Sequence, residues 1–342
     1  MIQRPSEKVM TNERNIISPM GRGNGAYFLH KMLERCVKGY RVRDYNPRWE
    51  YFPLAFPFFF HNENPSLIHT TPDYGFFFTR SGIPLVLTVH HLVLDSFMRQ
   101  YSSLAQRIHY RTDLLFFTRI SIIKAAALTA VSEFTAKMVR DELGFTGPIR
   151  IIYNGIDTVR FSPGSRSLKK RGLRVLFAGN LSLRKGVNLL PKIATLLSSD
   201  IEIVYTRGLR GGFDLPDLPN LRCLGRISNN DMPVLYRDSD ILIFPSVREG
   251  FGLVPAEAMA CGLPVVATDC SSLPELIDSG KGGFLCPIGD VDAFAEKINF
   301  LAENPELRRE MGKYNRAKVE KMFTLDRMAC EYQQLFEEVL SK

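Results

Sequence analysis

The sequence has few of the features that mark metal-binding or secreted proteins. It contains six cysteines, and no two of them show the C-x2-C spacing of a zinc site. Five of the six lie in apolar or helical surroundings, so we expect buried free thiols in a protein of a reducing compartment, the cytoplasm. The six are Cys36, Cys223, Cys261, Cys270, Cys286 and Cys330.

Long hydrophobic runs are also scarce. Residues 1–14 are polar and lack the apolar core of a signal peptide. The most apolar long stretch, 114–131, contains Arg119 and Lys124, either of which is costly at the centre of a bilayer. We therefore expect this stretch to form a core helix and a strand, not a membrane span.

What is present is a globular composition with a one-sided charge. The length of 342 residues predicts two domains with full cores, and a content of 45% hydrophobic and 23% charged residues is typical of a globular protein. Residues 1–162 carry 20 Lys and Arg against 13 Asp and Glu, a net charge of +7, whereas 163–342 are nearly balanced. This excess has two interpretations. It is either the ordinary surface lysine and arginine of a globular protein, or it serves to attract an anionic membrane surface or an anionic, lipid-linked acceptor. We expect no nucleic-acid partner, because no zinc finger, RNP-like strand or helix-turn-helix signature is present.

The most informative stretch is 241–275, which has the pattern of a strand–helix–strand unit. It predicts the strand 241–244, a turn at Gly250 and Gly252, a helix that starts at Pro255 and ends at Gly262, and the strand 263–267. The continuous apolar runs suit parallel strands that are covered on both faces. In such units ligands bind beyond the carboxyl ends of the strands, where a helix N-terminus offers free N–H groups.

Two carboxylates, Glu249 and Glu257, flank that predicted binding place. Acidic side chains are favourable near a helix start, so each is explained equally well as a solvated group. A carboxylate also accepts hydrogen bonds from paired hydroxyls. Two carboxylates around a phosphate-binding helix start therefore suit a ligand that has both a sugar and a diphosphate.

The run Glu249-Gly250-Phe251-Gly252-Leu253, with Glu257 eight positions after Glu249, resembles the signature of the retaining glycosyltransferases of family 4, also called glycosyl transferases group 1. The following segments ACGLPVVATD and LPELI are similar to that group as well. The resemblance implies the GT-B fold, an α/β architecture in which two doubly wound Rossmann-like domains face each other across a cleft. It also implies transfer of a sugar from a nucleoside diphosphate sugar to an acceptor hydroxyl, with retained anomeric configuration.

The domain boundary is expected near residue 165. Asn154-Gly155-Ile156-Asp157 with Phe161 looks like the segment that closes the N-terminal domain in this family, and the polar, basic stretch 162–171 suits a hinge. We predict an acceptor-side domain at 1–164 and a nucleotide-sugar-binding domain at 165–342. The last helix, 325–340, is expected to cross back to the N-terminal domain.

The resemblance also assigns roles to residues. It implies that Glu249 holds the hydroxyls of the donor sugar, Glu257 the ribose and Lys185 the diphosphate. His90, which follows a strand at Thr88-Val89, is expected to contact the donor sugar, with His91 as the alternative. Further donor contacts are expected from the N–H groups of Phe251, Gly252 and Leu253, from the glycine-rich loop at Gly23 and Gly25, and from Arg226 and Ile227 beside the base.

One position departs from the family pattern. Asn180 stands where the family has an arginine, five residues before Lys185, and we hypothesise that Arg184 supplies the missing positive charge. The departure leaves open a catalytically silent relative that only binds sugar nucleotides. A sugar-nucleotide epimerase or a phosphorylase of similar fold is a further alternative, although this sequence shows no recognisable context for the pyridoxal-binding lysine that a phosphorylase needs.

Two further segments have competing interpretations. The D-x-D sequences at 238–240 and 290–292 look structural, so we expect no metal in the protein and no Mg²⁺ requirement, with a loosely bound Mg²⁺ left open. The aromatic run 49–60, WEYFPLAFPFFF, is interpreted first as core packing beneath a loop and second as an exposed ledge for lipid. The acceptor is expected to be a carbohydrate or lipid-linked molecule of cell-surface polysaccharide or glycolipid synthesis, met by a cytoplasmic protein at the inner membrane face.

Overall fold

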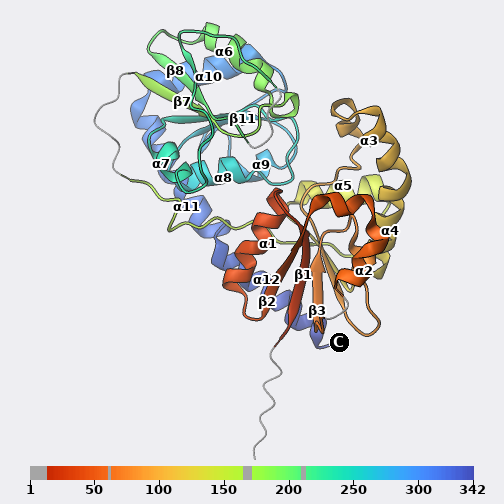
Figure 1. The fold of residues 1–342 in the computed structure, drawn as a ribbon. Helices are drawn as coiled ribbons and strands as arrows, with labels where there is room; N and C mark the ends of the chain where they lie inside the picture. Colours follow the sequence, from red (N-terminus) through yellow and green to blue (C-terminus); the bar gives the residue numbers. More distant parts are fainter. Residues whose placement is uncertain (1–13, 61–62, 165–171, 209–212) are drawn as a thin grey trace, which may run out of the picture.

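The computed structural model describes residues 14–60, 63–164, 172–208 and 213–342. Within them the chain forms two parallel sheets of six strands each, with helices packed on both faces. Figure 1 shows them as two layered units, one above the other. This is the doubly wound α/β architecture that the family resemblance implied.

The N-terminal unit has the strand order β2-β1-β3-β4-β5-β6. Its strands are β1 (Ile16–Gly21), β2 (Tyr40–Tyr45), β3 (Leu67–Thr70), β4 (Leu85–Val89), β5 (Ala127–Ala130) and β6 (Arg150–Ile151). Its α-helices are α1 (Gly25–Cys36), α2 (Phe56–Phe59), α3 (Leu104–His109), α4 (Leu115–Lys124) and α5 (Glu133–Leu143). Ser132 caps α5 by accepting a hydrogen bond from the Thr135 N–H, as expected.

The C-terminal unit has the strand order β12-β11-β10-β7-β8-β9. Its strands are β7 (Leu173–Phe177), β8 (Ile201–Tyr205), β9 (Leu221–Cys223), β10 (Ile241–Phe244), β11 (Val265–Thr268) and β12 (Gly283–Cys286). Its helices are α6 (Leu190–Leu196), α7 (Met232–Arg237), α8 (Leu253–Ala260), α9 (Leu273–Leu276), α10 (Val291–Glu303) and α11 (Pro305–Met322). All four residues of β10 are buried, which explains why its sequence is uninterrupted by polar residues.

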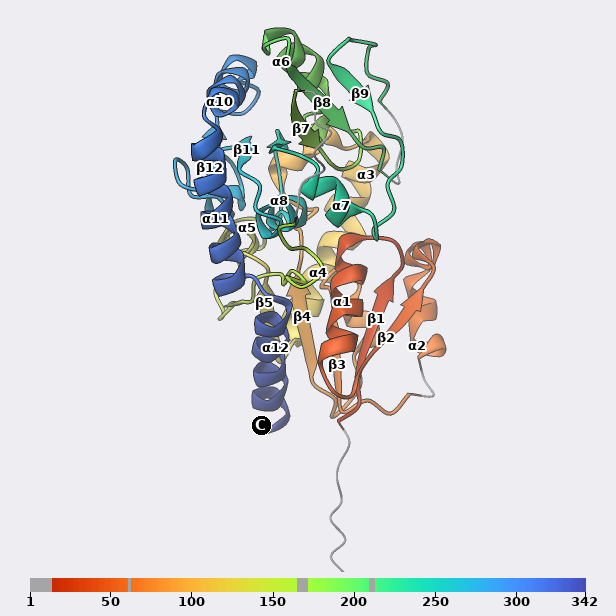
Figure 2. The same ribbon diagram turned by 90° about the vertical axis from the view of Figure 1, so that its left-hand side faces the viewer.

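The last helix, α12 (Leu325–Leu340), leaves the C-terminal unit and packs on the N-terminal one (Figure 2). Its buried face includes Met328, Tyr332 and Phe336, which share a core with Ile16 and Leu33. Thr324 caps it by accepting a hydrogen bond from the Arg327 N–H. One face of this helix is apolar because it covers the sheet of the other unit.

Several element boundaries differ from the expectations. Helix α8 begins at Leu253, so Pro255 is its third residue and not its first, whereas Gly262 ends it in the expected left-handed conformation (φ 78°). The largely apolar run at 149–153 predicts a strand, and only β6 forms there. The sequence from Val187 predicts a helix, which begins as a short 3-10 helix and becomes α6 at Leu190. Most of the predicted hinge lies outside the described residues, as do most of 1–14 and of the glycine-rich loop 208–212.

The cysteines were expected to be buried, and this was wrong for half of them. Cys36, Cys223 and Cys330 are exposed, whereas Cys261 and Cys286 are buried. The apolar neighbours of the exposed cysteines in the sequence lie on other faces of their helices and strands. Local composition therefore does not determine which way a single side chain points.

The aromatic run is mostly exposed, so the first interpretation, core packing, is wrong for it. Phe56 is buried, but five other side chains are 40% to 81% exposed on two short 3-10 helices and α2. We call these five the aromatic ledge: Trp49, Tyr51, Phe52, Leu54 and Phe58. Arg48 beside it is also exposed.

Candidate active site

The topology of the C-terminal sheet brings two distant segments together. The neighbouring strands β7 and β10 mark the place where the strand order reverses, because β8 and β9 continue on one side and β11 and β12 on the other. Ligands of doubly wound sheets bind beyond the carboxyl ends of such strands. The loop after β7 carries Lys185 and the loop after β10 carries Glu249.

A glycine allows these two loops to touch. Gly186 has φ 71°, and a Cβ at this position would lie 2.2 Å from the carbonyl oxygen of Pro245. This close approach places Lys185 Nζ 2.5 Å from Glu249 Oε1 and 4.9 Å from the centre of the Phe244 ring. The lysine is therefore held against the strand end as a buried cation.

Glu249 is surrounded by hydrogen-bond donors. Its Oε1 accepts from Ser246 Oγ at 2.5 Å and lies 3.5 Å from Arg184 Nη1, while its own N–H donates to Ser271 Oγ at 3.0 Å. Burial by itself raises the pKa of Glu249, but the charges of Lys185 and Arg184 outweigh it and the pKa ends below its usual value. The cluster therefore holds two cations and one carboxylate, an excess of one positive charge.

Glu257 has a different environment from Glu249. It lies on α8, and its Oε2 accepts a hydrogen bond from the Tyr236 hydroxyl at 2.9 Å. Burial raises its pKa to about 7, because the nearest opposing influences, Tyr236 and the charge of Arg160, are weaker than the desolvation. The two acids of the motif are thus chemically distinct, one ionised and the other close to its midpoint at neutral pH.

The N-terminal unit closes over this cluster at Gly250. A Cβ on Gly250 would lie 2.0 Å from the carbonyl oxygen of His90, so only glycine permits this contact. The carbonyl of Gly250 accepts hydrogen bonds from Ser132 Oγ at 2.6 Å and Thr135 Oγ1 at 3.0 Å. Ser132 is therefore both a helix cap and a contact between the two units.

The neighbouring Arg248 forms a second contact across the cleft. Its Nη2 donates to Asp95 Oδ1 at 2.8 Å, and its Nε donates to the other oxygen of the same carboxylate. The guanidinium lies 4.7 Å from the ring centres of both Phe97 and Phe134. A bidentate pair held between two rings is buried and rigid.

Glu275 adds a third contact between the units. Its two oxygens accept hydrogen bonds from the N–H groups of Glu133 and Phe134 at 2.9 and 2.8 Å, at the start of α5. A carboxylate there is favoured by the positive end of the helix dipole. The sequence interpretation missed Arg248 and Asp95, and it noted Glu275 only within the LPELI resemblance. No local pattern reveals a partner on the other domain.

His90 and His91 follow β4 and lie at this interface. Burial lowers the pKa of each to about 4, and the charge of Arg184 contributes at His91. His91 also experiences the charges of Glu249 and Lys185. Both imidazoles are therefore neutral at pH 7. His91, the alternative, lies within range of the charges of the Lys185–Glu249 cluster, whereas His90, the expected residue, meets the motif through its backbone carbonyl at Gly250.

The remaining predicted residues lie in more open positions. Gly23 and Gly25 have no heavy atom within 4 Å of a built Cβ. Asn180 lies against Gly208, whose added Cβ would be 2.1 Å from Asn180 Oδ1. Arg226 is exposed, and Ile227 is half-buried against the core of the C-terminal unit.

The D-x-D segments are occupied by structural contacts. Asp240 Oδ2 accepts from the Arg174 N–H at 2.9 Å, and Asp290 caps α10 through the Ala293 N–H at 2.9 Å. In the part of the chain that the structure describes, no three His, Cys, Asp or Glu side chains form a group able to hold a metal ion. Among the described helices, none has the length and apolarity needed to cross a bilayer.

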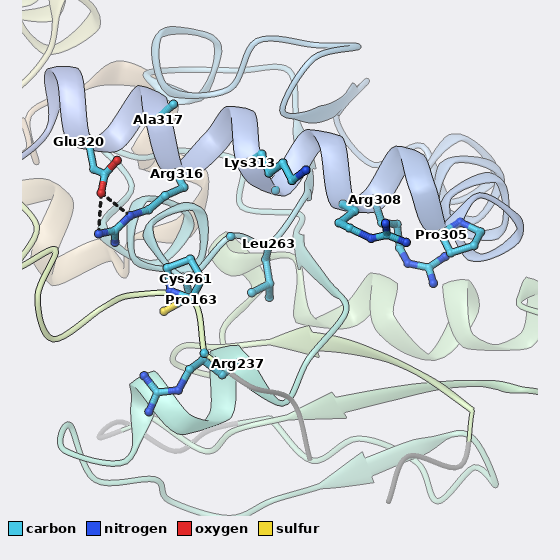
Figure 3. A pocket seen from close by; sticks show the side chains of 14 residues that line it. Pro163, Arg237, Cys261, Leu263, Pro305, Arg308, Lys313, Arg316, Ala317 and Glu320 are labelled. Atoms are coloured by element: carbon cyan, nitrogen blue, oxygen red, sulfur yellow. Dashed lines mark hydrogen bonds and ion pairs between the residues drawn. The ribbon is translucent and has the colours of Figure 1, made fainter. Parts of the chain in front are cut away.

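A cavity of about 580 Å³ lies between α11, α7 and residues 163–164, and none of the described residues that line it belongs to the Lys185–Glu249 cluster (Figure 3). One of the cations that line it, Arg316, is held by several structural contacts. Arg316 donates to the carbonyls of Phe161 at 2.7 Å, Ala260 at 2.9 Å and Thr158 at 3.0 Å, and pairs with Glu320. This arginine ties the end of the N-terminal unit to the C-terminal one.

Comparison with known proteins agrees with this geometry. Residues 16–160 match the family model described as Glycosyltransferase Family 4, and residues 217–318 match Glycosyl transferases group 1. The chain is 34% identical over 221 residues to D-inositol 3-phosphate glycosyltransferase of Corynebacterium jeikeium, covering 57% of this chain and 52% of that protein. It thus spans about half the length of that curated relative.

Two solved structures show the same fold. Sucrose-phosphate synthase from Thermosynechococcus elongatus superposes with a TM-score of 0.79 at 20% identity, covering 96% of this chain and 99% of the other. HepE from Anabaena, crystallised with UDP and glucose, superposes with a TM-score of 0.75 at 18% identity, covering 96% and 100%. Since the two family models match separate parts of the sequence and together more than two thirds of it, this chain belongs to the group 1, family 4 glycosyltransferases of the GT-B fold.

Proposed function

We propose that this protein transfers a sugar from a nucleoside diphosphate sugar to an acceptor hydroxyl, with retention of the anomeric configuration. The observation that carries the proposal is the Lys185–Arg184–Glu249 cluster at the reversal point of the C-terminal sheet. Its excess positive charge suits a diphosphate, and its carboxylate suits sugar hydroxyls.

In the proposed mechanism the protein promotes the transfer by orienting the substrates and by stabilising the charge that develops on the leaving group. Lys185 and Arg184 stabilise the negative charge that develops on the leaving nucleoside diphosphate. Glu249 then exchanges its contact with Lys185 for the hydroxyls of the donor sugar. The leaving phosphate itself takes the proton of the acceptor hydroxyl, which places the new bond on the face that the leaving group vacates. Because side chains supply the cations, the proposal needs no divalent metal.

The remaining donor contacts follow from position. Glu257, with a pKa of about 7, is proposed to bind the ribose hydroxyls. The N–H groups of Phe251, Gly252 and Leu253 at the start of α8 are proposed to bind phosphate or sugar oxygens. Additional donor contacts are proposed for Gly23, Gly25, Asn180, Arg226 and Ile227.

The donor is proposed to be a UDP- or GDP-sugar. HepE, which has the same fold, was crystallised with UDP and glucose. Base and sugar selection depend on loop geometry, so the similarity of fold supports the class of donor and not the individual sugar.

The acceptor is proposed to be a carbohydrate on a lipid, as in cell-surface polysaccharide or glycolipid synthesis. The aromatic ledge supports this, because it exposes five large apolar side chains beside Arg48 in the basic half of the chain. Aromatic side chains with neighbouring cations suit the interface of an anionic membrane. The protein would then act at the inner face of the cell membrane.

A panel of UDP-, GDP- and ADP-sugars tests the proposal. Thermal shift reports binding, and release of the nucleoside diphosphate in the presence of membrane extract reports turnover. We expect one donor to bind and to be consumed, with Lys185→Met abolishing consumption. Binding without turnover would support the silent relative that Asn180 makes conceivable, and absence of binding to every donor would refute the proposal.

A further inference from the structure

The N-terminal unit contains a buried chain of hydrogen-bonding side chains that ends at His90. Its members come from five strands and two helices, and its longest-range contact joins residues 244 positions apart in sequence. Ser18, His30, His69, Thr88 and Thr129 are fully buried, and Tyr40 and Tyr332 are 2% exposed. Such a network, when every member is paired, sets one arrangement of protons.

The contacts in the chain are short. Thr88 Oγ1 lies 2.7 Å from Thr129 Oγ1, 2.9 Å from the Tyr332 hydroxyl and 2.7 Å from His69 Nε2. The Tyr40 hydroxyl lies 2.8 Å from His69 Nδ1 and 2.8 Å from His30 Nδ1.

The other nitrogen of His30 continues the chain towards the cleft. His30 Nε2 lies 3.0 Å from His90 Nε2, and Ser18 Oγ lies 2.7 Å from His30 Nδ1. Every ring nitrogen of His30 and His69 is therefore in contact with a partner.

The positions of the protons in this hydrogen-bond network can be deduced by starting at its Thr129 end. We assign the hydroxyl proton of Thr129 to its contact with the carbonyl of Leu87 at 3.2 Å, because a carbonyl oxygen can only accept. Thr129 Oγ1 must then accept the hydrogen bond that joins it to Thr88, so the hydroxyl proton of Thr88 is used in the Thr88–Thr129 bond. Thr88 therefore accepts from His69, which carries its proton on Nε2.

The same reasoning carries on to the cleft. With its proton on Nε2, His69 accepts at Nδ1 from the Tyr40 hydroxyl. Tyr40, having donated, accepts from His30, which carries its proton on Nδ1 and shares it with Ser18 Oγ. The Nε2 atom of His30 is then an acceptor, so His90 must donate from its own Nε2.

This leaves Nδ1 of His90 as a lone-pair acceptor. The atom is buried and has no hydrogen-bond partner among the residues that the structure describes. A buried polar atom without a partner costs free energy unless a ligand or water satisfies it, so the free Nδ1 at the end of this network requires an explanation.

We propose that His30 is a positioning residue that fixes the tautomer of His90, so that Nδ1 of His90 accepts a hydrogen bond from a hydroxyl of the bound sugar. The assignment of the tautomer does not depend on the proposed function, whereas the nature of the hydroxyl rests on it. Burial lowers the pKa of His30 and His69 well below the usual value, so the network is neutral and each ring carries a single proton.

The tautomer is measured directly by NMR on the full chain with ¹⁵N-labelled histidine rings. We expect the signals of His90 to show a protonated Nε2 and an unprotonated Nδ1 at pH 7, and those of His30 the opposite, with His90→Gln and His30→Gln used for assignment. A proton on Nδ1 of His90, or a mixture of the two forms, would overturn the assignment.

The positioning role is tested with a pair of variants. His30→Gln keeps an acceptor oxygen for His90 Nε2 and is expected to keep donor consumption within about twofold of the wild type. His30→Leu removes the acceptor, so we expect mixed His90 signals and a loss of about tenfold in kcat/KM for the donor. Equal kcat/KM in the two variants and the wild type would overturn the role.

The two proposals fail in different ways. If no donor is consumed but a sugar hydroxyl ligand shifts the Nδ1 signal of His90, the tautomer and its ligand stand while the transferase proposal fails. If the donor is consumed and the Nδ1 signal is unchanged by bound UDP-sugar, the inference about His90 is wrong and the transferase proposal stands. The wild-type spectra decide this even if His30→Leu does not fold.

Discussion

Gly250→Ala tests whether the two domains must touch at the motif. The added Cβ would lie 2.0 Å from the carbonyl oxygen of His90 and 3.1 Å from its carbonyl carbon. An ordinary carbon–oxygen contact needs about 3.5 Å, so the backbones must separate by more than about 1 Å. Both sides of the contact are main chain, and neither can rotate away as a side chain would.

The separation would disturb the cleft in a defined way. It lengthens the bonds from Ser132 and Thr135 to the Gly250 carbonyl and moves Glu249 relative to His90. Misplacement by about 1 Å in an active site costs about 100-fold in rate. We therefore expect kcat for donor turnover to fall about 100-fold, while each domain keeps its own core and its fold.

The assay is the initial rate of nucleoside diphosphate release as a function of donor concentration, with circular dichroism as the check on folding. Gly21→Ala is the matched control, because its added Cβ would meet chiefly the flexible end of the Glu50 side chain. We expect this control to retain kcat within about threefold. If Gly250→Ala also retained kcat within that range, the contact with His90 would not belong to the working state and the reasoning would be refuted.

Three further predictions concern the charges and the surface. Arg184→Ala removes one of the two cations facing Glu249, so kcat/KM for the donor should fall about tenfold or more; the Arg184→Lys variant should recover part of it. Burial raises the pKa of Glu257 from its usual 4.5 to about 7. The protonated side chain therefore contributes to the stability of the folded state below pH 4.5, and this contribution is lost as the pH rises towards 7. The loss is at most about 3 kcal/mol. Glu257→Gln should therefore raise Tm relative to wild type at pH 8 but not at pH 4.5, while weakening donor binding. Replacing Phe52 and Phe58 by serine should weaken sedimentation with vesicles containing anionic lipid and leave hydrolysis of the donor unchanged, and equal sedimentation would count against the ledge as a membrane contact.

Much of the fold and part of the site were readable from local patterns. The strand 241–244 and the helix 325–340 are found at the residues where they were expected. These are local properties, since a buried strand must be apolar on both faces and a cap acts within one turn. The spacing of Glu249 and Glu257 also pointed to one end of one sheet.

Whether a side chain is buried or exposed could not be predicted from such local patterns. The aromatic run 49–60 has the composition of a core segment, yet most of its large side chains face outward. Hydrophobicity does not reveal which surface remains to cover a segment, because that depends on the elements packed around it.

What the sequence by itself determined is therefore the two-domain α/β class and the donor motif at 249–257. The partners of the residues around that motif were decided by the tertiary structure alone: Asp95 for Arg248, the start of α5 for Glu275, and His30 for His90. Each of these pairs joins residues 60 or more positions apart, and only the packing of the sheets and domains brings such residues within hydrogen-bonding distance. Periodicity and capping act over a few residues, whereas the cleft and its proton arrangement are properties of the assembled fold.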